Sequence, residues 1–352
     1  MLVVDCSFLS QKITGTQKFA SEICKALKKQ DDSIVFVSHP NILQKELAEK
    51  LNVKIIGHKS YKLFRFLRLP GGLLWEQLVL PFYVNKHYNG AKLLSLVNIA
   101  PIFYKNNIFA LHDVAFKRYP EFFKTLFLMV YNTIIPIALK RAKKVLTVSE
   151  FSKKEIVKFF TVDESKIDIV YNAVLNQKKE TNKDRTEKYI LAVGSIEPRK
   201  NISRLIEAMA ELNGIKLIIV GGQNSKVFNG NIDKQSNINI KFTGYVKDSE
   251  LEKLYANATA FIYPSIYEGF GIPPLEAQSF GIPTIVSDIE VFHEVYEDSV
   301  YYVDPYDISS IQSGIKKVMD DKQLQLLLIK RGYENVKKYS WEKSAKKILG
   351  IV

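Results

Sequence analysis

The sequence predicts an α/β protein with two domains, each built on a parallel β-sheet that helices cover on both faces. Short apolar runs that suit strands alternate with amphipathic runs that suit helices along the chain. The chain has 352 residues, which is more than a domain with one hydrophobic core usually contains and suits two domains. A polar stretch without large apolar residues, "NQKKETNKDRTEK" at 176–188, separates two series of strands and helices.

Seven short apolar runs in the first half predict β-strands. They are residues 1–6, 33–38, 53–57, 92–97, 107–113, 144–149 and 166–172. A helix is predicted after the first strand, at residues 16–29, because apolar side chains recur at helical spacing from Phe19 to Leu27.

Two further helices are predicted in the first half. In residues 149–160, Ser149 and Ser152 are both candidate N-caps, and Glu155 stands three residues after Ser152, as in a capping box. The longest apolar run, residues 125–139, is shorter than the roughly 20 residues that a membrane span needs. We expect it to form a buried helix.

The second half repeats the alternation of strands and helices. Strands are predicted at 189–194, 216–222, 239–246, 259–265, 282–288 and 299–305. Helices are predicted at 201–212, at 248–258, inside 266–283 and after the last of these strands through to Val352. Two such series resemble two Rossmann-like domains facing each other. Ligands of these sheets bind at the carboxyl ends of the strands, so we expect the site in the cleft between the domains.

The composition excludes several classes of protein. The only two cysteines, Cys6 and Cys24, provide neither a disulfide framework nor a zinc site and suit buried thiols in a reducing cytosol. The opening "MLVVDCSFLS" lacks the basic region and cleavage site of a signal peptide.

The net charge of +13 is concentrated in the first half. Residues 1–175 contain 26 Lys and Arg against 14 Asp and Glu, a net charge of +12. Such a field favours an anionic partner, which could be nucleic acid, an anionic membrane surface or a phosphorylated acceptor.

The stretch "GSIEPRKN", residues 194–201, follows a predicted strand and places two cations before a helix. Arg199 can bind a diphosphate in a fork and Lys200 as a point charge, beside the free N–H groups of the helix start. The alternative is a solvated helix start with surface charge, and spacing alone favours that alternative.

The stretch "IYEGFGIPPLEAQSFGIP", residues 266–283, holds two carboxylates. Because Pro273 and Pro274 suit the first turn of a helix, Glu276 lies near the helix start and Glu268 lies in the preceding loop. Carboxylates accept hydrogen bonds from hydroxyl groups, and the loop glycines allow a close approach of the backbone to a ligand. The pattern suits a nucleotide sugar; the alternative is one glutamate that stabilises the helix dipole and one surface glutamate.

"EGFGIPPLE" resembles the Glu-x7-Glu signature of retaining glycosyltransferases with the two-Rossmann GT-B fold, in the large family 4 (glycosyl transferases group 1) that includes bacterial α-mannosyltransferases. "GSIEPRKN", "GYVKDSELEKLYANA", "LHDV", "TVSEFSKKEI" and "VYNAV" stand at similar places and in the same order. The resemblance covers nearly the whole chain and is strongest in the second half. "DCSFLSQKITGTQKFASEI" and "WEQLVLP" are similar to members that build O-antigen and capsule chains.

The resemblance implies roles for the residues of the second half. Glu268 would hold hydroxyls of the donor sugar, Glu276 would bind the ribose, and Arg199 and Lys200 would stabilise the diphosphate leaving group. The remaining implied donor-binding residues of this half are Ser195, Val246, Leu251, Gly269, Phe270 and Gly271. Asp248, between Val246 and Leu251, is the expected N-cap of its helix.

In the first half, the resemblance implies that His112 would face the sugar and that Gly15 would let its loop approach the diphosphate. For a lone histidine, the alternative is a satisfied core or loop residue. The last segment, 336–352, would return to the first domain near Trp341. The expected first domain is therefore 1–175 together with about 336–352, and the expected second domain is 188–335, with a linker at 176–187 between them. The two domains could close over substrate by a hinge motion.

The chain has no Asp-x-Asp and no His/Cys cluster with ligand spacing, so we expect no metal and assign its task to the two cations. The expected activity is retaining transfer of a hexose. GDP-mannose is favoured by the resemblance, while rhamnosyl, glucosyl and N-acetylhexosaminyl donors stay open. Alternatives are an epimerase or phosphorylase of the same fold and a non-catalytic binding subunit. A nicotinamide dehydrogenase is disfavoured, since no G-x-G-x-x-G follows an early strand.

The acceptor implied by the resemblance is a lipid-diphosphate-linked or polysaccharide chain at the inner face of the membrane. Residues 61–75 interleave basic with apolar side chains, which suits an anionic interface; the alternative is an ordinary helix with an apolar core side. We therefore expect a cytoplasmic protein held peripherally at the membrane. No recognition motif for nucleic acid accompanies the charge.

Overall fold

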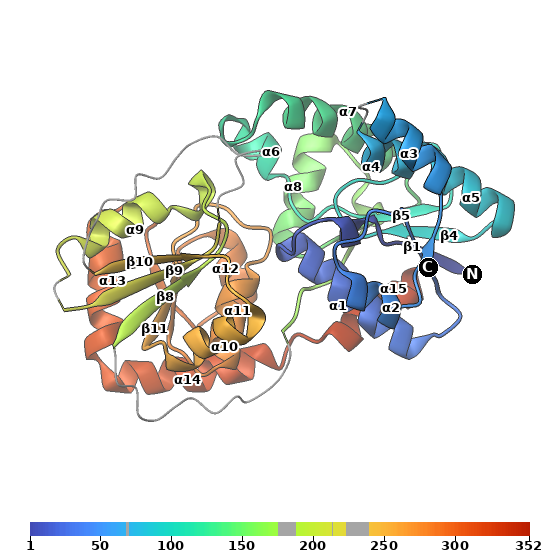
Figure 1. Cartoon of the computed structure of the whole chain (residues 1–352). Coiled ribbons are helices and arrows are strands. Elements are labelled where there is room, and N and C mark those ends of the chain that lie inside the picture. Colours follow the sequence, from blue (N-terminus) through green and yellow to red (C-terminus); the bar gives the residue numbers. More distant parts are fainter. Residues whose placement is uncertain (68–69, 175–187, 213, 223–238) are drawn as a thin grey trace. The chain divides into compact units, whose positions relative to one another are not determined.

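The computed structural model describes residues 1–67, 70–174, 188–212, 214–222 and 239–352 (Figure 1). The chain divides into two compact units. Unit 1 comprises Met1–Val114, Met129–Asn172 and Trp341–Val352, and unit 2 comprises Ala115–Leu128 and Ala173–Ser340. The predicted linker, 176–187, lies outside the described residues.

Unit 1 is built on a parallel seven-stranded sheet with the order β3-β2-β1-β4-β5-β6-β7. Each strand lies inside one of the predicted apolar runs. The bounds are β1 Leu2–Asp5, β2 Val35–Ser38, β3 Lys54–Ile55, β4 Lys92–Ser95, β5 Asn107–Ala110, β6 Lys144–Thr147 and β7 Ile167–Ile169. The central strands are fully buried, as expected for a parallel sheet with two covered faces.

The helices of unit 1 include α1, predicted from the spacing of its apolar residues, and α8, predicted from its candidate N-caps. The bounds are α1 Gly15–Gln30, α2 Lys45–Lys50, α3 His58–Phe66, α4 Gly71–Leu74, a π-helical turn Trp75–Val79, α5 Leu80–His87, α7 Thr125–Arg141, α8 Glu150–Phe160 and α15 Trp341–Ile351. Of α7, the part from Met129 onwards belongs to unit 1. Ser149 is the N-cap of α8, since its side chain accepts a hydrogen bond from the Ser152 N–H. The predicted capping box on Ser152 is therefore wrong, because Ser152 already lies inside the helix.

The apolar run at 125–139 does form a helix, α7, but the helix is only partly buried. Ile135, Ala138 and Leu139 are buried, whereas Leu126 and Met129 are exposed. The prediction of a buried helix is thus wrong for its first half. No helix in the described part of the chain is long and apolar enough to cross a lipid bilayer.

The C-terminal helix α15 belongs to unit 1 and packs along α1. The ring of Trp341 contacts that of Phe19 on α1, with the centroids 6.0 Å apart, and the Ser344 hydroxyl donates to the carbonyl of Tyr171. The assignment to unit 1 starts at Trp341, five residues after α14 ends at Val336. Unit 2 also includes Ala115–Leu128 of the first half, a segment that we expected in the first domain.

Unit 2 is built on a parallel six-stranded sheet with the order β10-β9-β8-β11-β12-β13. Its strands are β8 Tyr189–Val193, β9 Lys216–Val220, β10 Ile240–Gly244, β11 Ala260–Tyr263, β12 Thr284–Ser287 and β13 Tyr301–Val303. Its helices are α6 Ala115–Arg118, α9 Ile202–Met209, α10 Asp248–Asn257, α11 Ile272–Ser279, α12 Glu290–Tyr296, α13 Ile308–Asp320 and α14 Lys322–Val336.

Helices α9 and α13 lie on one face of this sheet and α10, α11 and α12 on the other (Figure 1). Leu205 of α9 and Ile311 and Ile315 of α13 pack on strand residues such as Ile190 and Ile262 in one buried cluster. The chain passes from β8 to β9 on one side and from β11 to β12 on the other. Neighbouring strands β8 and β11 thus flank the point where the strand order reverses, which is where ligands of such sheets bind.

Candidate active site

The two predicted motifs of unit 2 meet at the carboxyl ends of β8 and β11. Segment 194–201 continues from β8, and segment 264–271 continues from β11, which pairs with β8 in the sheet. The backbone N–H of Ile266 donates to the carbonyl of Arg199 over 2.8 Å, which joins the two segments. Arg199, Lys200 and Glu268 therefore form one cluster.

Lys200 is the buried cation of this cluster. Its Nζ donates to Glu268 Oε1 over 2.5 Å and to the Tyr263 hydroxyl over 2.6 Å, and it also lies 4.9 Å from the centroid of the Tyr263 ring. Lys200 is 7% exposed and Glu268 is 6% exposed. A lysine held in this way presents its positive charge at a fixed place.

Arg199 lies beside Lys200 and contacts two carboxylates. Its Nη2 lies 2.8 Å from Glu197 Oε1, and its Nη1 lies 3.3 Å from Glu268 Oε2. The same Nη1 is 3.5 Å from the carbonyl oxygen of Tyr267. Glu268 thus bridges both cations, with one carboxylate oxygen on each.

The charges of the cluster shift the pKa values of its members. Burial acts to raise the pKa of Glu268, but the charges of Lys200 and Arg199 and the hydrogen bond from Lys200 outweigh it and hold that pKa below its ordinary value. Burial, followed by repulsion from Arg199, lowers the pKa of Lys200 despite the opposing pull of Glu268 and Glu197. The lowered pKa values of the pair favour an ionised carboxylate and a lysine that loses its proton more readily than usual.

Asn201 locks the turn that carries the two cations. Pro198–Lys200 form one 3-10 turn, and Asn201 follows it in the left-handed conformation with a φ of 59°. Its side-chain amide donates to the carbonyls of Pro264 and Pro305, over 3.1 and 2.6 Å. These contacts tie the turn to the loops after β11 and β13 and fix the directions of Arg199 and Lys200.

The glycine-containing loop leads into α11 as expected, although the helix starts at Ile272, one residue before the first proline. Gly271 is the N-cap with a φ of 89°, and its carbonyl accepts a hydrogen bond from the Tyr296 hydroxyl. A Cβ at Gly271 would lie 2.8 Å from the Phe292 ring, so only glycine fits without a shift. Phe270 is buried and its ring contacts that of Tyr339 at 5.4 Å.

The other predicted donor residues of unit 2 have separate surroundings. The Ser195 hydroxyl donates to Glu197 Oε1 over 3.2 Å, which brings Ser195 into the cluster. Glu276 Oε2 accepts a hydrogen bond of 2.9 Å from the hydroxyl of buried Tyr255. Val246 and Leu251 are half-buried around the start of α10.

The N-cap of α10 is Lys247, with Asp248 the first helical residue, so the predicted cap at Asp248 is wrong by one position. An acidic residue in the first turn still complements the helix dipole.

His112 and Gly15 belong to unit 1 and are described there alone. His112 is 5% exposed, its Nε2 lies 2.9 Å from the carbonyl oxygen of Leu96, and its ring meets that of Phe19 edge-on at 4.8 Å. Burial lowers the pKa of His112, which favours the neutral ring. Gly15 is the first residue of α1, and a Cβ there would meet nothing within 4 Å, so the fold of unit 1 does not itself require glycine.

Comparison with known proteins places this geometry in a family. The model of "Glycosyltransferase Family 4" matches residues 13–175, and that of "Glycosyl transferases group 1" matches residues 174–335. The chain is 32% identical over 324 residues to the O-antigen chain mannosyltransferase RfbU of Salmonella typhimurium, with 90% of each chain covered. The chain belongs to glycosyltransferase family 4. It therefore transfers a sugar from a nucleotide sugar.

Further relatives and solved structures agree with this membership. The glycosyltransferase is 31% identical over 250 residues to O-antigen chain mannosyltransferase B of Escherichia coli, with 66% of each chain covered. The fold matches that of Anabaena HepE in complex with UDP and glucose, with a TM-score of 0.74, 14% identity and 99% and 98% of the two chains covered. It also matches WaaG, with a TM-score of 0.71, 12% identity and coverage of 100% and 99%. The fold is therefore GT-B.

Sequence reasoning missed three members of the cluster in this glycosyltransferase. Glu197 contacts Arg199 and Ser195, Tyr263 binds Lys200, and Asn201 holds the turn. The signal for Tyr263 was its place at the end of a strand that leads into the glutamate loop. Glu197 and Asn201 lie in the motif at 194–201, but no sequence pattern indicated what their side chains contact.

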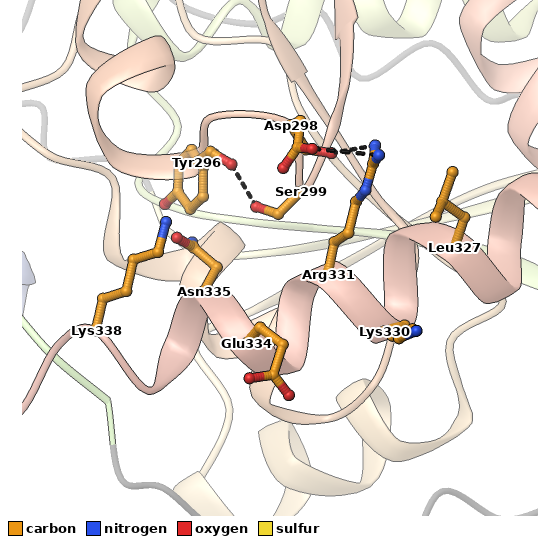
Figure 2. Close-up of a pocket in the computed structure, with 9 residues that line it drawn as sticks. All are labelled: Tyr296, Asp298, Ser299, Leu327, Lys330, Arg331, Glu334, Asn335 and Lys338. Atoms are coloured by element: carbon orange, nitrogen blue, oxygen red, sulfur yellow. Dashed lines mark hydrogen bonds and ion pairs between the residues drawn. The ribbon is translucent and has the colours of Figure 1, made fainter.

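A hollow of about 360 Å³ lies elsewhere in unit 2, between the loop after α12 and helix α14 (Figure 2). Two of its charged lining residues form ion pairs, Arg331 with Asp298 and Lys338 with Glu297. None of the predicted site residues lines it.

Among the residues that the structure describes, no group of three or more His, Cys, Asp or Glu side chains could hold a metal ion. The positive charges beside Glu268 are those of Arg199 and Lys200. Two cations and two carboxylates suit a ligand that brings both an anionic diphosphate and hydroxyl groups.

Proposed function

We propose that this glycosyltransferase moves mannose from GDP-mannose to a lipid-linked or polysaccharide acceptor in the synthesis of an O-antigen-like surface glycan, with retention at the anomeric carbon. The observation that carries the proposal is the similarity to the RfbU mannosyltransferase over 90% of both chains. Other relatives named as mannosyltransferases, among them WbdA of Escherichia coli at 28% identity over 61% of this chain, support the same donor sugar.

The cluster supports specific roles for its residues. Arg199 and Lys200 bind the diphosphate, and Glu268 accepts hydrogen bonds from the sugar hydroxyls. The amides of Gly269, Phe270 and Gly271 position that sugar. The side chain of Ser195 adds a hydroxyl on the diphosphate side.

The remaining proposed roles lie around this core. Glu276, oriented by the Tyr255 hydroxyl, binds the ribose, and Val246 and Leu251 border the base. From unit 1, His112 contributes a ring to the sugar and Gly15 a backbone N–H to the diphosphate. Each of these roles is a proposal from the family pattern.

The proposed chemistry follows from charge. The bond between the anomeric carbon and the diphosphate oxygen breaks, negative charge grows on the diphosphate, and two fixed cations stabilise it. The acceptor hydroxyl attacks the same face of the sugar and gives its proton to the departing phosphate oxygen. Retention follows, and no carboxylate nucleophile is needed.

A donor screen tests the proposed function. The purified protein is melted with GDP-, UDP-, dTDP- and ADP-sugars, since a ligand that binds only the folded state raises the melting temperature. GDP-mannose is expected to give the largest rise and to be the donor consumed in transfer assays. A larger rise with another nucleotide sugar would overturn the choice of donor, and product analysis with and without acceptor would reveal epimerase or phosphorylase activity.

Removal of divalent metals is expected to leave the transfer rate unchanged, because Arg199 and Lys200 stabilise the leaving group. The measurement is the rate in excess EDTA, compared with the rate in added magnesium and manganese. A rate that disappears in EDTA and returns with one of these metals would contradict the role given to the two cations.

We also propose that unit 1 binds an anionic membrane surface at the cytoplasmic face. In α3 and just after it, Leu63, Phe66 and Leu67 are exposed by 53%, 84% and 52%, beside exposed Lys62. Side chains of this kind insert into the headgroup region while basic residues bind anionic lipid. The side chain of Arg65 and residues 68–69, which the same prediction included, lie outside the described part of the chain.

Replacing Phe66 and Leu67 together by Ser is expected to weaken binding to phosphatidylglycerol vesicles by at least about fivefold, since apolar burial is lost. Co-sedimentation measures the bound fraction. Leu326→Ser, at a residue of unit 2 that is 68% exposed, is the matched control and should bind like the unchanged protein. Equal binding to neutral and anionic vesicles would contradict the electrostatic part of the proposal.

A further inference from the structure

We propose that Glu197 is a positioning residue that acts as the permanent counter-ion of Arg199 and keeps the site from retaining simple anions. The inference rests on the proposed binding of the donor diphosphate by Arg199 and Lys200. The family resemblance implies no role for Glu197.

The geometry of Glu197 is that of a fixed support. Its side chain is fully buried, and its Oε1 lies 2.8 Å from Arg199 Nη2 and accepts from the Ser195 hydroxyl over 3.2 Å. Its carbonyl accepts from the Lys200 N–H over 3.0 Å, which closes the turn that carries both cations. Pro198 follows it and restricts its backbone. A carboxylate placed in this way cannot swing away to meet a ligand.

Glu268 differs from Glu197 in what it can exchange. It stands at the start of the glycine-containing loop, and its oxygens lie on Lys200 and Arg199 at 2.5 and 3.3 Å. Hydroxyl groups of a donor sugar can donate hydrogen bonds to these oxygens in place of the two cations, because a carboxylate accepts several hydrogen bonds. Glu268 therefore serves as the exchangeable counter-ion and Glu197 as the permanent one.

The four charges together select for a complete donor. Two carboxylates balance Arg199 and Lys200, so a bare anion must compete with carboxylates that are already in place. An intact nucleotide sugar brings hydroxyl donors that satisfy Glu268 as its diphosphate meets the cations. The nucleoside diphosphate product lacks that sugar and meets the restored charge of Glu268, which favours its release.

The test uses Glu197→Gln and inorganic pyrophosphate as the probe. Glutamine keeps the shape and can accept a hydrogen bond from Arg199, but it removes one negative charge. Pyrophosphate is expected to bind the variant about tenfold more tightly than the unchanged protein at low ionic strength. Titration calorimetry measures both affinities. If Glu197 only supported the structure, Glu197→Gln would bind pyrophosphate more weakly. Unchanged or weaker binding of pyrophosphate by Glu197→Gln would therefore overturn the charge-balance role.

Glu197→Ala separates positioning from charge. This variant removes the same charge and also the side chain that holds Arg199 in place. We therefore expect Glu197→Ala to bind pyrophosphate at least about threefold more weakly than Glu197→Gln does. Equal affinities of the Gln and Ala variants would overturn the positioning role. Asp298→Asn, which removes a carboxylate from the Arg331 pair in the same unit, is the matched control and should bind pyrophosphate like the unchanged protein.

A further variant keeps the proposal testable if Glu197→Gln does not fold. Glu197→Asp retains the charge with a shorter reach, so we expect transfer to slow at least about tenfold with no gain in pyrophosphate affinity. Unchanged transfer by that variant would overturn the proposal. If the unchanged protein binds neither nucleotide sugars nor pyrophosphate, the proposed donor site itself fails, which is a different result.

Discussion

Replacing Lys200 by Met is expected to lower kcat/KM for sugar transfer by about 10²- to 10³-fold, the usual effect of removing one preorganised group that stabilises developing negative charge. Methionine has an unbranched side chain of similar length but carries no charge. In this variant Glu268 loses its 2.5 Å bond to Lys200 and keeps its 3.3 Å contact with Arg199. Steady-state kinetics with GDP-mannose measure the effect.

The same variant is expected to be less stable, because Glu268 is buried and loses its shorter ion pair. Removing one partner of a buried pair typically costs about 3 kcal/mol. Urea unfolding measures this loss separately from activity. A variant with full transfer activity would contradict the assignment of Lys200 to the leaving group, whatever its stability.

Lys200→Arg provides the pH control, because arginine keeps its charge at all accessible pH values. Burial and the neighbouring Arg199 lower the pKa of Lys200 from its ordinary 10.5, so its charge is lost at a lower pH than for an exposed lysine. Transfer by the unchanged protein should therefore fall on the alkaline side as pH rises through that lowered pKa. In Lys200→Arg this fall should move to higher pH, and an identical alkaline limb in both proteins would contradict the role.

Gly221→Ala is expected to destabilise unit 2 by at least about 3 kcal/mol, through a clash and a strained backbone together. A Cβ at Gly221 would lie 1.8 Å from the carbonyl oxygen of Gly194, and Gly221 has a φ of 143°. Gly194 follows β8 and Gly221 follows β9, so the clash would fall at the carboxyl ends of these two paired strands. Denaturant unfolding measures the loss.

Gly214→Ala is the matched control for Gly221→Ala. Gly214 also has a positive φ, 79°, but a Cβ there would meet nothing within 4 Å. Only the backbone strain of about 1 kcal/mol is then expected. Equal losses in the two variants would show that the close approach to Gly194 is not what limits position 221.

Much of the fold was predictable, because a parallel sheet buried on both faces requires continuous apolar strands. Runs such as 189–194 and 259–265 stand out for this reason, and each contains a strand. Helix ends were less predictable. Ser149 and Ser152 both suit an N-cap, and only the path of the chain after β6 makes Ser149 the one that caps α8.

The candidate site was predictable as two separate motifs and not as one cluster. The sequence shows that Lys200 and Glu268 each follow a strand, but it does not show that β8 and β11 are neighbours, which brings them within 2.5 Å. The burial of Glu197 could not be predicted, because no sequence pattern distinguishes a buried glutamate before a proline from an exposed one. The place of Ala115–Leu128 in unit 2 depends on contacts far along the chain, such as that between the rings of Tyr119 and Tyr267.

The most direct test of the central claim is a crystal structure of this glycosyltransferase with GDP-mannose. We expect diphosphate oxygens within hydrogen-bond distance of Arg199 and Lys200, a sugar hydroxyl donating to Glu268, and Glu197 still paired with Arg199. Diphosphate bound away from both cations, with Glu268 still held by Lys200 at about its present 2.5 Å, would contradict this expectation.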